Sequence, residues 1–160
     1  MMMQHTDFNN HIIDRADQHS RWLDTRLNAR PALRARLAAD LGQAFTAESM
    51  RAALAEAPDL GIALRHLREQ VMARLLVRDI GGLADLAEVM RTCTDLAEIS
   101  IRTGLERLQA DLIEVHGEPL DSRGQPQQMM VIGMGKLGGG ELNVSSDIDL
   151  IFVYPEGGET

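Results

Sequence analysis

The chain has 160 residues, 44% of them hydrophobic and 25% charged, which fits one globular domain and excludes collagen-like, low-complexity and strongly disordered chains. Its formal net charge of −8 argues against a nucleic-acid-binding surface, because such surfaces are normally basic. The single cysteine, Cys93, cannot form an internal disulfide, and no apolar run or N-terminal signal pattern indicates a membrane or secreted protein, so we expect a cytoplasmic one.

The first part of the chain is predicted to be helical, because its apolar residues are mainly Leu, Ala, Ile, Val and Met. A first helix is expected over about residues 7–30, ending before Pro31, and a second from Pro31 to about Gly42. Thr46 is the candidate cap of a short helix that runs to Ala57.

The clearest helical pattern runs from Asp59 to Asp79, where five apolar residues fall on one stripe: Leu60, Leu64, Leu67, Val71 and Leu75. Another helix is expected over 83–91, and a longer one is expected to start at Thr94 or Asp95. On that longer helix, one face carries Leu105, Leu108, Leu112 and Val115. The arginines at 65, 68, 74 and 78 are expected on a solvated face, with contact to a partner or to the following domain as the alternative.

The character of the sequence changes after a turn-rich linker over 117–126. Residues 129–132 predict a short strand, and 147–154 predict a second one that ends at Pro155. Two strands do not form an independently stable sheet, so we expect the N-terminal piece of a longer α+β protein. The alternative is a complete small helical domain that ends in a hairpin.

Between the two strands lies a glycine cluster over 133–140, which contains Lys136, the only lysine of the chain. Its G-x-G-x-x-G pattern, with Glu156 about 20 residues further on, matches the dinucleotide-binding fingerprint. The segment before the second strand is too short for a parallel crossover, however, so this interpretation is disfavoured. A P-loop is rejected, because Leu137 stands where a Ser or Thr is needed.

The favoured interpretation joins the glycines to a D-x-D pair, Asp147 and Asp149. On a strand, side chains two residues apart point to one face, about 6–7 Å apart, where two carboxylates repel by roughly 2–3 kcal/mol. A divalent cation between them removes that repulsion. Metal ions held by carboxylates serve phosphoryl and nucleotidyl transfer, and Ser145, Ser146 and Lys136 are candidates to contact phosphate oxygens. A solvated edge strand is the structural alternative.

Two segments, 135–152 and 74–86, resemble the bifunctional glutamine synthetase adenylyltransferase/adenylyl-removing family, the first at its nucleotidyltransferase signature and the second at its helical leader. The resemblance implies a DNA-polymerase-β-like mixed sheet that begins within this chain. It divides the chain into a helical leader region, 1–125, and the first strands and glycine/D-x-D motif of an incomplete nucleotidyltransferase domain, 126–160. By the same resemblance, the Glu141-Leu142-Asn143 sequence and the helical leader are typical of the N-terminal, adenylyl-removing copy.

The resemblance also implies a chemistry. Asp147 and Asp149 would bind Mg²⁺, with Mn²⁺ as the other candidate ion, while Gly138, Gly139 and Ser146 would contact phosphate. ATP, ADP and inorganic phosphate would be the substrates or products. Glutamine synthetase would be the protein substrate, and the PII signalling protein would be a partner of the rest of the full-length protein.

Some features depart from the family pattern. Gly140 and Val77 stand where the family has a charged and an aromatic residue, and the third metal-binding carboxylate that the fold expects is not within these 160 residues. We therefore expect this chain to be inactive alone. The rival interpretations are another nucleotidyltransferase of the same superfamily and a non-catalytic helical interaction module.

Overall fold

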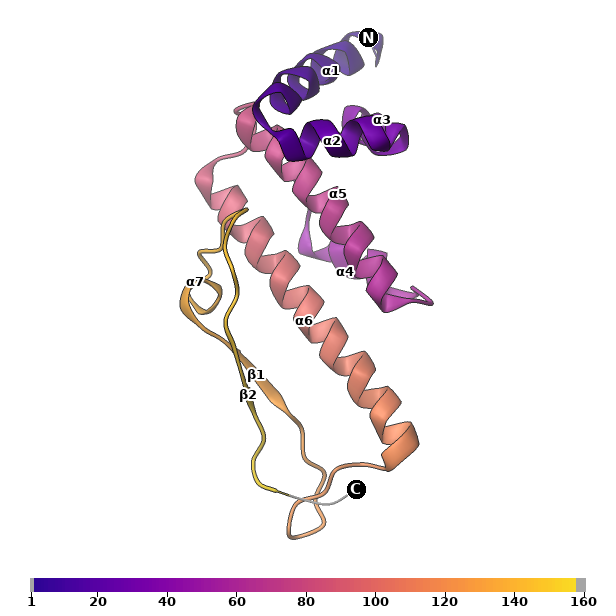
Figure 1. Ribbon diagram of the computed structural model, residues 1–160, viewed down its shortest axis with the longest axis vertical. Helices are drawn as coiled ribbons and strands as arrows, with labels where there is room; N and C mark the ends of the chain where they lie inside the picture. Colours follow the sequence, from indigo (N-terminus) through magenta and orange to yellow (C-terminus); the bar gives the residue numbers. More distant parts are fainter. Residues whose placement is uncertain (1, 158–160) are drawn as a thin grey trace.

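The computed structural model describes residues 2–157, with side chains from Thr6 onward. Helices fill most of the chain up to residue 116 and two short strands follow, which confirms the α+β expectation at this coarse level. The two longest helices run side by side in opposite directions, and the strands lie along the second of them (Figure 1). The elements, in chain order, are α1 (Met2–His19), α2 (Arg21–Ala29), α3 (Pro31–Asp40), α4 (Ala47–Ala55), α5 (Leu60–Ile80), α6 (Leu86–His116), β1 (Met130–Gly133), α7 (Gly135–Gly138) and β2 (Leu150–Val153).

The single helix predicted over 7–30 is wrong, because Ser20 divides it into α1 and α2. Ser20 has an extended backbone, and its Oγ accepts a hydrogen bond from the amide of Leu23 at 3.3 Å. A serine in this role satisfies an otherwise unpaired amide at a helix start, so a new helix begins there with a new direction. The change of direction allows α1, α2 and α3 to pack around one buried cluster with the C-terminal half of α5, the largest members being Ile13, Leu23, Leu37, Leu41 and Val77.

Two other predicted helix starts are confirmed. Thr46 caps α4 through a reciprocal pair of hydrogen bonds with Ser49, although α4 ends at Ala55 rather than Ala57. Asp59 caps α5, its carboxylate accepting a hydrogen bond from the amide of Ile62 at 2.8 Å. Both caps act over three residues, which is why local sequence is enough to find them.

The two helices predicted on either side of residues 92–93 are one continuous helix, α6, so this prediction is wrong. The helix starts after Asp85, whose carboxylate accepts from the amide of Glu88 at 2.7 Å, and it passes through Thr92 and Thr94 without a break. Both threonines are buried. Threonine suggests a helix start where its hydroxyl is free to cap, but here tertiary packing buries both side chains within the helix. Helix α6 ends at His116, and the following Gly117 has a φ of 85°, which lies in the left-handed region.

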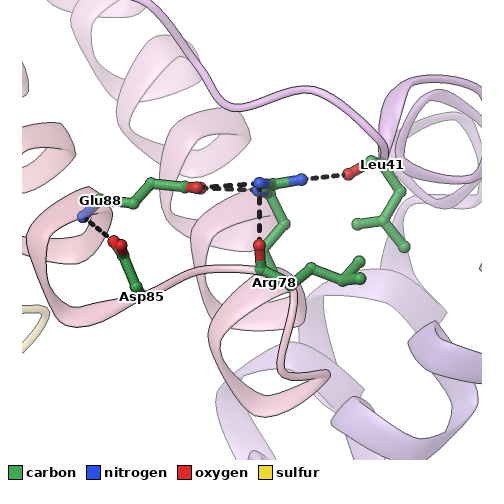
Figure 2. Close-up of polar contacts among 5 residues, drawn as sticks. Leu41, Arg78, Asp85 and Glu88 are labelled. Atoms are coloured by element: carbon green, nitrogen blue, oxygen red, sulfur yellow. Dashed lines mark hydrogen bonds and ion pairs between the residues drawn. The ribbon is translucent and has the colours of Figure 1, made fainter.

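Arg78 lies buried where α3, α5 and α6 meet, as Figure 2 shows. Its guanidinium donates two hydrogen bonds to the Glu88 carboxylate, from Nε at 2.6 Å and from Nη2 at 2.9 Å. Its Nη1 donates to the carbonyl oxygen of Leu41 at 2.7 Å, and Nη2 to that of Leu83 at 3.2 Å. The hydrogen bond with Glu88 raises the pKa of Arg78 above its usual value. The expectation of a solvated position for this arginine is therefore wrong.

The strands β1 and β2 pair antiparallel, with Met130 opposite Val153 and Gly133 opposite Leu150. Antiparallel pairing confirms that the dinucleotide-binding interpretation fails, since that motif requires parallel strands joined by a crossover. The segment between the strands is anchored on the helices by Leu137 and Leu142, which are buried against Leu75, Val89 and Cys93. No helix within residues 2–157 is both long enough and apolar enough to cross a membrane.

Candidate functional site

The glycine cluster forms a tight connection in which β1 leads directly into the short helix α7. A Cβ atom placed on Gly138 would lie 2.5 Å from the carbonyl oxygen of Gly133, closer than real contacts allow. Gly135 and Gly140 have φ of 54° and 70°, a region that favours glycine. Backbone geometry therefore explains three of these glycines without a ligand. The predicted phosphate contact of Gly138 and Gly139 stays a prediction.

Lys136, in the first turn of α7, is exposed, and its side chain forms no ion pair with a described residue. Its carbonyl oxygen accepts a hydrogen bond from the amide of Glu141 at 2.8 Å, which closes the turn after the helix. A free ammonium group beside the turn is compatible with the predicted contact to a phosphate oxygen, which no described contact tests.

Asn143 organises the turn that contains the two predicted serines. Its Oδ1 accepts hydrogen bonds from the amide and the hydroxyl of Ser145, at 3.1 and 3.0 Å, and from the hydroxyl of Ser146 at 3.0 Å. The hydroxyl oxygen of Ser146 accepts from the amide of Asn143 at 3.1 Å. The sequence interpretation gave Asn143 no such role, although Asn two residues before Ser is a pattern typical of a side-chain-stabilised turn.

The two aspartates precede β2 instead of lying within it, so the strand predicted over 147–154 is wrong at its start. Strand β2 begins at Leu150. The carbonyl oxygen of Asp149 accepts from the amide of Met134 at 2.9 Å, whereas Asp147 follows directly on the Asn143 turn. That turn keeps the chain from joining the ladder earlier. The prediction that both carboxylates share one strand face therefore loses its basis, and their joint role stays a proposal.

The chemistry of the aspartate side chains suits a hard cation as part of its ligand set. Both carboxylates are exposed, and neither forms an ion pair with a described residue. Carboxylate oxygens are the ligands that Mg²⁺ and Ca²⁺ prefer. Within residues 2–157, no group of three acidic, histidine or cysteine side chains is placed to hold a metal ion. The described residues thus supply two candidate ligands and leave the set incomplete.

Ser146 and Asp147 lie on an open groove of about 460 Å³, here called the α5/α6 groove. Arg65 and Arg68 of α5 and Ser100 of α6 line the same groove. Gly138 lines a separate hollow of about 300 Å³ together with Glu98 and Arg102. The structure therefore brings Ser146 and Asp147 to two arginines that the sequence interpretation left on a solvated face. The signal in the sequence that could have placed Arg65 and Arg68 together is their spacing of three residues on one helix.

Cys93 also borders the α5/α6 groove, but its thiol is buried in the cluster with Leu137 and Leu142. Burial, with a smaller contribution from Asp79, raises the pKa of Cys93 to about 11. The thiolate is the nucleophilic form of cysteine, so a thiol with this pKa is inert near neutral pH. The expectation that Cys93 is a packing residue is confirmed.

Comparison with known proteins finds relatives whose names describe adenylyltransferases. Residues 3–160 match the family model described as glutamate-ammonia ligase adenylyltransferase.

Relatives named bifunctional glutamine synthetase adenylyltransferase/adenylyl-removing enzyme occur in several bacteria. The relative from Aromatoleum aromaticum is 51% identical over 145 residues, which cover 88% of this chain and 16% of the relative. The relative from Chromobacterium violaceum is 51% identical over 154 residues, covering 92% and 17%. The relative from Nitrosomonas eutropha is 45% identical over 152 residues, covering 89% and 16%. The chain thus spans about one sixth of the length of these relatives.

Proposed function

Because the chain belongs to the glutamate-ammonia ligase adenylyltransferase family, we propose that it contributes the first part of the adenylyl-removing site of a bifunctional enzyme that acts on glutamine synthetase. Residues 1–125 would form the helical leader, and 126–160 would begin a nucleotidyltransferase domain with a DNA-polymerase-β-like sheet. In the full-length protein, the ATP-dependent adenylylating site and the contacts with the PII signalling protein would lie outside this chain.

The reaction proposed for this site is a phosphorolysis. Inorganic phosphate attacks the phosphorus of the adenylyl group on a tyrosine of glutamine synthetase. A phosphorus–oxygen bond to phosphate forms, and the bond between phosphorus and the tyrosyl oxygen breaks. The proton of the attacking hydrogen phosphate ends on the tyrosyl oxygen, so the products are ADP and glutamine synthetase with its tyrosine side chain unmodified. In-line displacement at phosphorus needs positioned reactants and stabilised charge more than covalent help from the protein.

The residues of this chain would bind the divalent cation and orient the reacting phosphate group. Asp147 and Asp149 would be two ligands of a divalent cation, Mg²⁺ or Mn²⁺, which neutralises charge on the phosphate oxygens when bound. Asn143 holds Ser145 and Ser146 in a fixed turn immediately before the aspartates. Fixed polar groups next to a reacting phosphate cost no reorganisation during the reaction, and this raises their catalytic effect.

One observation carries the proposal: Asp147, an exposed carboxylate that forms no ion pair with a described residue, lies with Ser146 on a groove that Arg65 and Arg68 also line. Metal-assisted transfer to or from phosphate needs acidic side chains for the cation and donors for the phosphate oxygens, and this groove has both. A purely structural loop has no need of that combination.

The test uses the full-length enzyme with Asp147→Asn. We expect phosphate-dependent release of AMP groups as ADP from adenylylated glutamine synthetase to fall by at least about a hundredfold, because a metal ligand is lost. ATP-dependent adenylylation should persist, since the proposal places it at another site. The two activities are measured separately with radiolabelled adenylyl groups.

The matched control is Asp111→Asn, which removes an exposed carboxylate on α6 that does not line the α5/α6 groove and should leave both activities unchanged. Unchanged removal by the Asp147→Asn enzyme would overturn the assignment and favour a non-catalytic helical module. If Asp147→Asn abolished adenylylation and left removal intact, Asp147 would belong to the adenylylating site instead.

A further inference from the structure

Two arginines, Arg65 and Arg68, line the α5/α6 groove, and the proposed reaction does not yet say which phosphate group they contact. Three segments enclose the groove: the first half of α5, the middle of α6 and the loop from Leu142 to Ile148. Leu64, Leu96 and Val144 give it an apolar floor. The volume of about 460 Å³ falls within the range of small-molecule sites, which combine apolar surface with a few polar groups.

The four arginines of α5 divide into two pairs with different surroundings. Arg78 is buried against Glu88. Arg74 forms an ion pair with Asp40 at 3.3 Å, and its guanidinium lies over the Phe45 ring, 4.5 Å from the ring centroid. Arg65 and Arg68 are exposed, and neither guanidinium has an ion pair or hydrogen bond among the described residues. Within the part of the chain that the structure describes, the contacts of Arg74 and Arg78 stabilise the helical region, whereas Arg65 and Arg68 have no such contacts.

Two unpaired guanidinium groups beside each other create a local site for an anion. Residues three apart are neighbours on a helix surface, so Arg65 and Arg68 lie on the same side of α5. Among the described residues, Asp147 is the one acidic side chain that lines the groove, so the lining has an excess of positive charge in a chain of net charge −8. Guanidinium groups present a planar fork of donors that matches two oxygens of a phosphate.

We propose that Arg65 and Arg68 bind the phosphate group that enters as inorganic phosphate and leaves as the β-phosphate of ADP. The apolar floor then accommodates the adenine ring, and the Ser146–Asp147 side of the groove faces the adenylyl phosphorus. This inference rests on the proposed function for the direction of the reaction. The phosphate site itself rests on the groove, its charge and the two unpaired arginines. The helical region thereby contributes substrate-binding residues as well as support for the motif.

The test compares the full-length enzyme with its Arg65→Ala/Arg68→Ala double variant. Binding of ADP in the presence of Mg²⁺ is measured by calorimetry, without turnover. The dissociation constant should rise by about tenfold or more, because hydrogen bonds to charged groups are lost. In the removal reaction, KM for inorganic phosphate should rise similarly, while KM for adenylylated glutamine synthetase stays within about twofold.

The control is the Arg21→Ala/Arg36→Ala double variant, which removes the same charge from exposed positions on α2 and α3. It should bind ADP as the unmodified enzyme does, which separates local contact from a change in net charge. If the variant with alanines at 65 and 68 does not fold, Arg65→Gln with Arg68→Gln gives the same measurement. ADP affinity and phosphate KM within twofold of the unmodified enzyme would overturn the inference.

The two proposals fail in distinguishable ways. If Asp147→Asn abolishes removal but the arginine variant keeps its ADP affinity and phosphate KM, only the role of the arginines is wrong. If the arginine variant loses ADP affinity while Asp147→Asn leaves removal intact, the groove binds a nucleoside diphosphate, but the removal site lies elsewhere.

Discussion

The helical region, residues 2–116, and the motif region, residues 130–157, bury their apolar side chains very differently. The helical region has fully buried side chains on several helices, among them Ile13, Leu23, Val71 and Val77. In the motif region, the strand residues Met130, Ile132, Ile151 and Phe152 are 46–59% exposed, and the buried hydrophobic side chains are Leu137 and Leu142. The first region has its own core, whereas the second depends on two leucines that reach into the core of the first.

This difference indicates how the site is built. A dense helical core provides a rigid surface, and a short glycine-rich segment is placed against it by few contacts. Substitutions in the helical region should therefore unfold the chain. Substitutions at the anchors should release the motif region while the helices remain folded.

The largest stability effect is expected for Arg78→Ala, at the junction of three helices. The substitution leaves the partly buried Glu88 without its partner, and breaking such a pair costs up to about 3–5 kcal/mol. Denaturant unfolding followed through Trp22, the single tryptophan, measures the loss. Arg123→Ala is the control: its pair with Asp121 is at the surface, with the arginine side chain 84% exposed, and should contribute less than about 1 kcal/mol. Equal effects of the two variants would contradict a structural role for Arg78.

Cys93 reports on the boundary between the two regions. With a pKa of about 11 instead of 9, its thiolate fraction at pH 8 should be about a hundredfold lower than that of a free thiol, so alkylation by iodoacetamide should be slow. The unfolded thiol loses its proton at lower pH than the folded one. This contribution to the free energy of unfolding is therefore complete below pH 9 and is lost as the pH rises towards 11. Alkylation at the rate of an exposed peptide thiol would show that the boundary is open.

Leu142→Ala should detach the motif region. Leu142 is buried beside Cys93, and most of its buried neighbours belong to the helices. Truncating it should lower the free energy that holds the motif region on the helices by about 2–3 kcal/mol. We expect faster alkylation of Cys93 with little change in the unfolding midpoint seen by Trp22. Ile151→Ala, which truncates an exposed residue on β2, should change neither. A large loss of helical stability in the Leu142 variant would mean that the two regions unfold as one.

Two adjacent glycines of the motif turn, Gly138 and Gly139, should respond differently to alanine. Gly138→Ala should cost about 1–3 kcal/mol of motif stability, because its Cβ would lie 2.5 Å from the Gly133 carbonyl oxygen. Gly139→Ala should be tolerated, since its Cβ would be 3.5 Å from the nearest atom and its φ is −84°. Hydrogen exchange of the motif amides measures the change in motif stability in each of the two variants. Loss of activity without loss of protection in Gly139→Ala would support a direct phosphate contact there.

The smallest effect is expected at the start of α4. Thr46→Ala removes a cap and should lower the free energy of unfolding by about 1 kcal/mol. The hydroxyl of Thr25, an exposed residue of α2, donates back to the carbonyl oxygen of Arg21 and has no other partner among the described residues, so Thr25→Ala should be neutral or slightly stabilising. The Trp22 unfolding transition distinguishes the two threonines, and a cost at Thr25 as large as that at Thr46 would contradict the capping explanation.

Local sequence was sufficient wherever the structure depends on residues a few positions apart. The cap at Thr46, the helix start at Asp59, the existence of two strands and the position of the glycine cluster were predicted correctly, because each depends on interactions within one turn or on one short run. The Ser20 break was missed although its cap is equally local, since the apolar pattern continues across it. The start of β2 was misplaced because the Asn143 turn keeps Asp147 out of the ladder.

By itself, the sequence determined the helix-rich composition, the D-x-D pair after the glycines and the membership of a family. Tertiary structure alone decided that Arg78 is buried, that α6 continues through Thr92 and Thr94, and that Ser146 and Asp147 share a groove with Arg65 and Arg68. Those groups come from segments far apart in the chain. Propensity and spacing describe only neighbours in sequence, whereas burial and charge pairing depend on which distant surfaces the folded helices bring together.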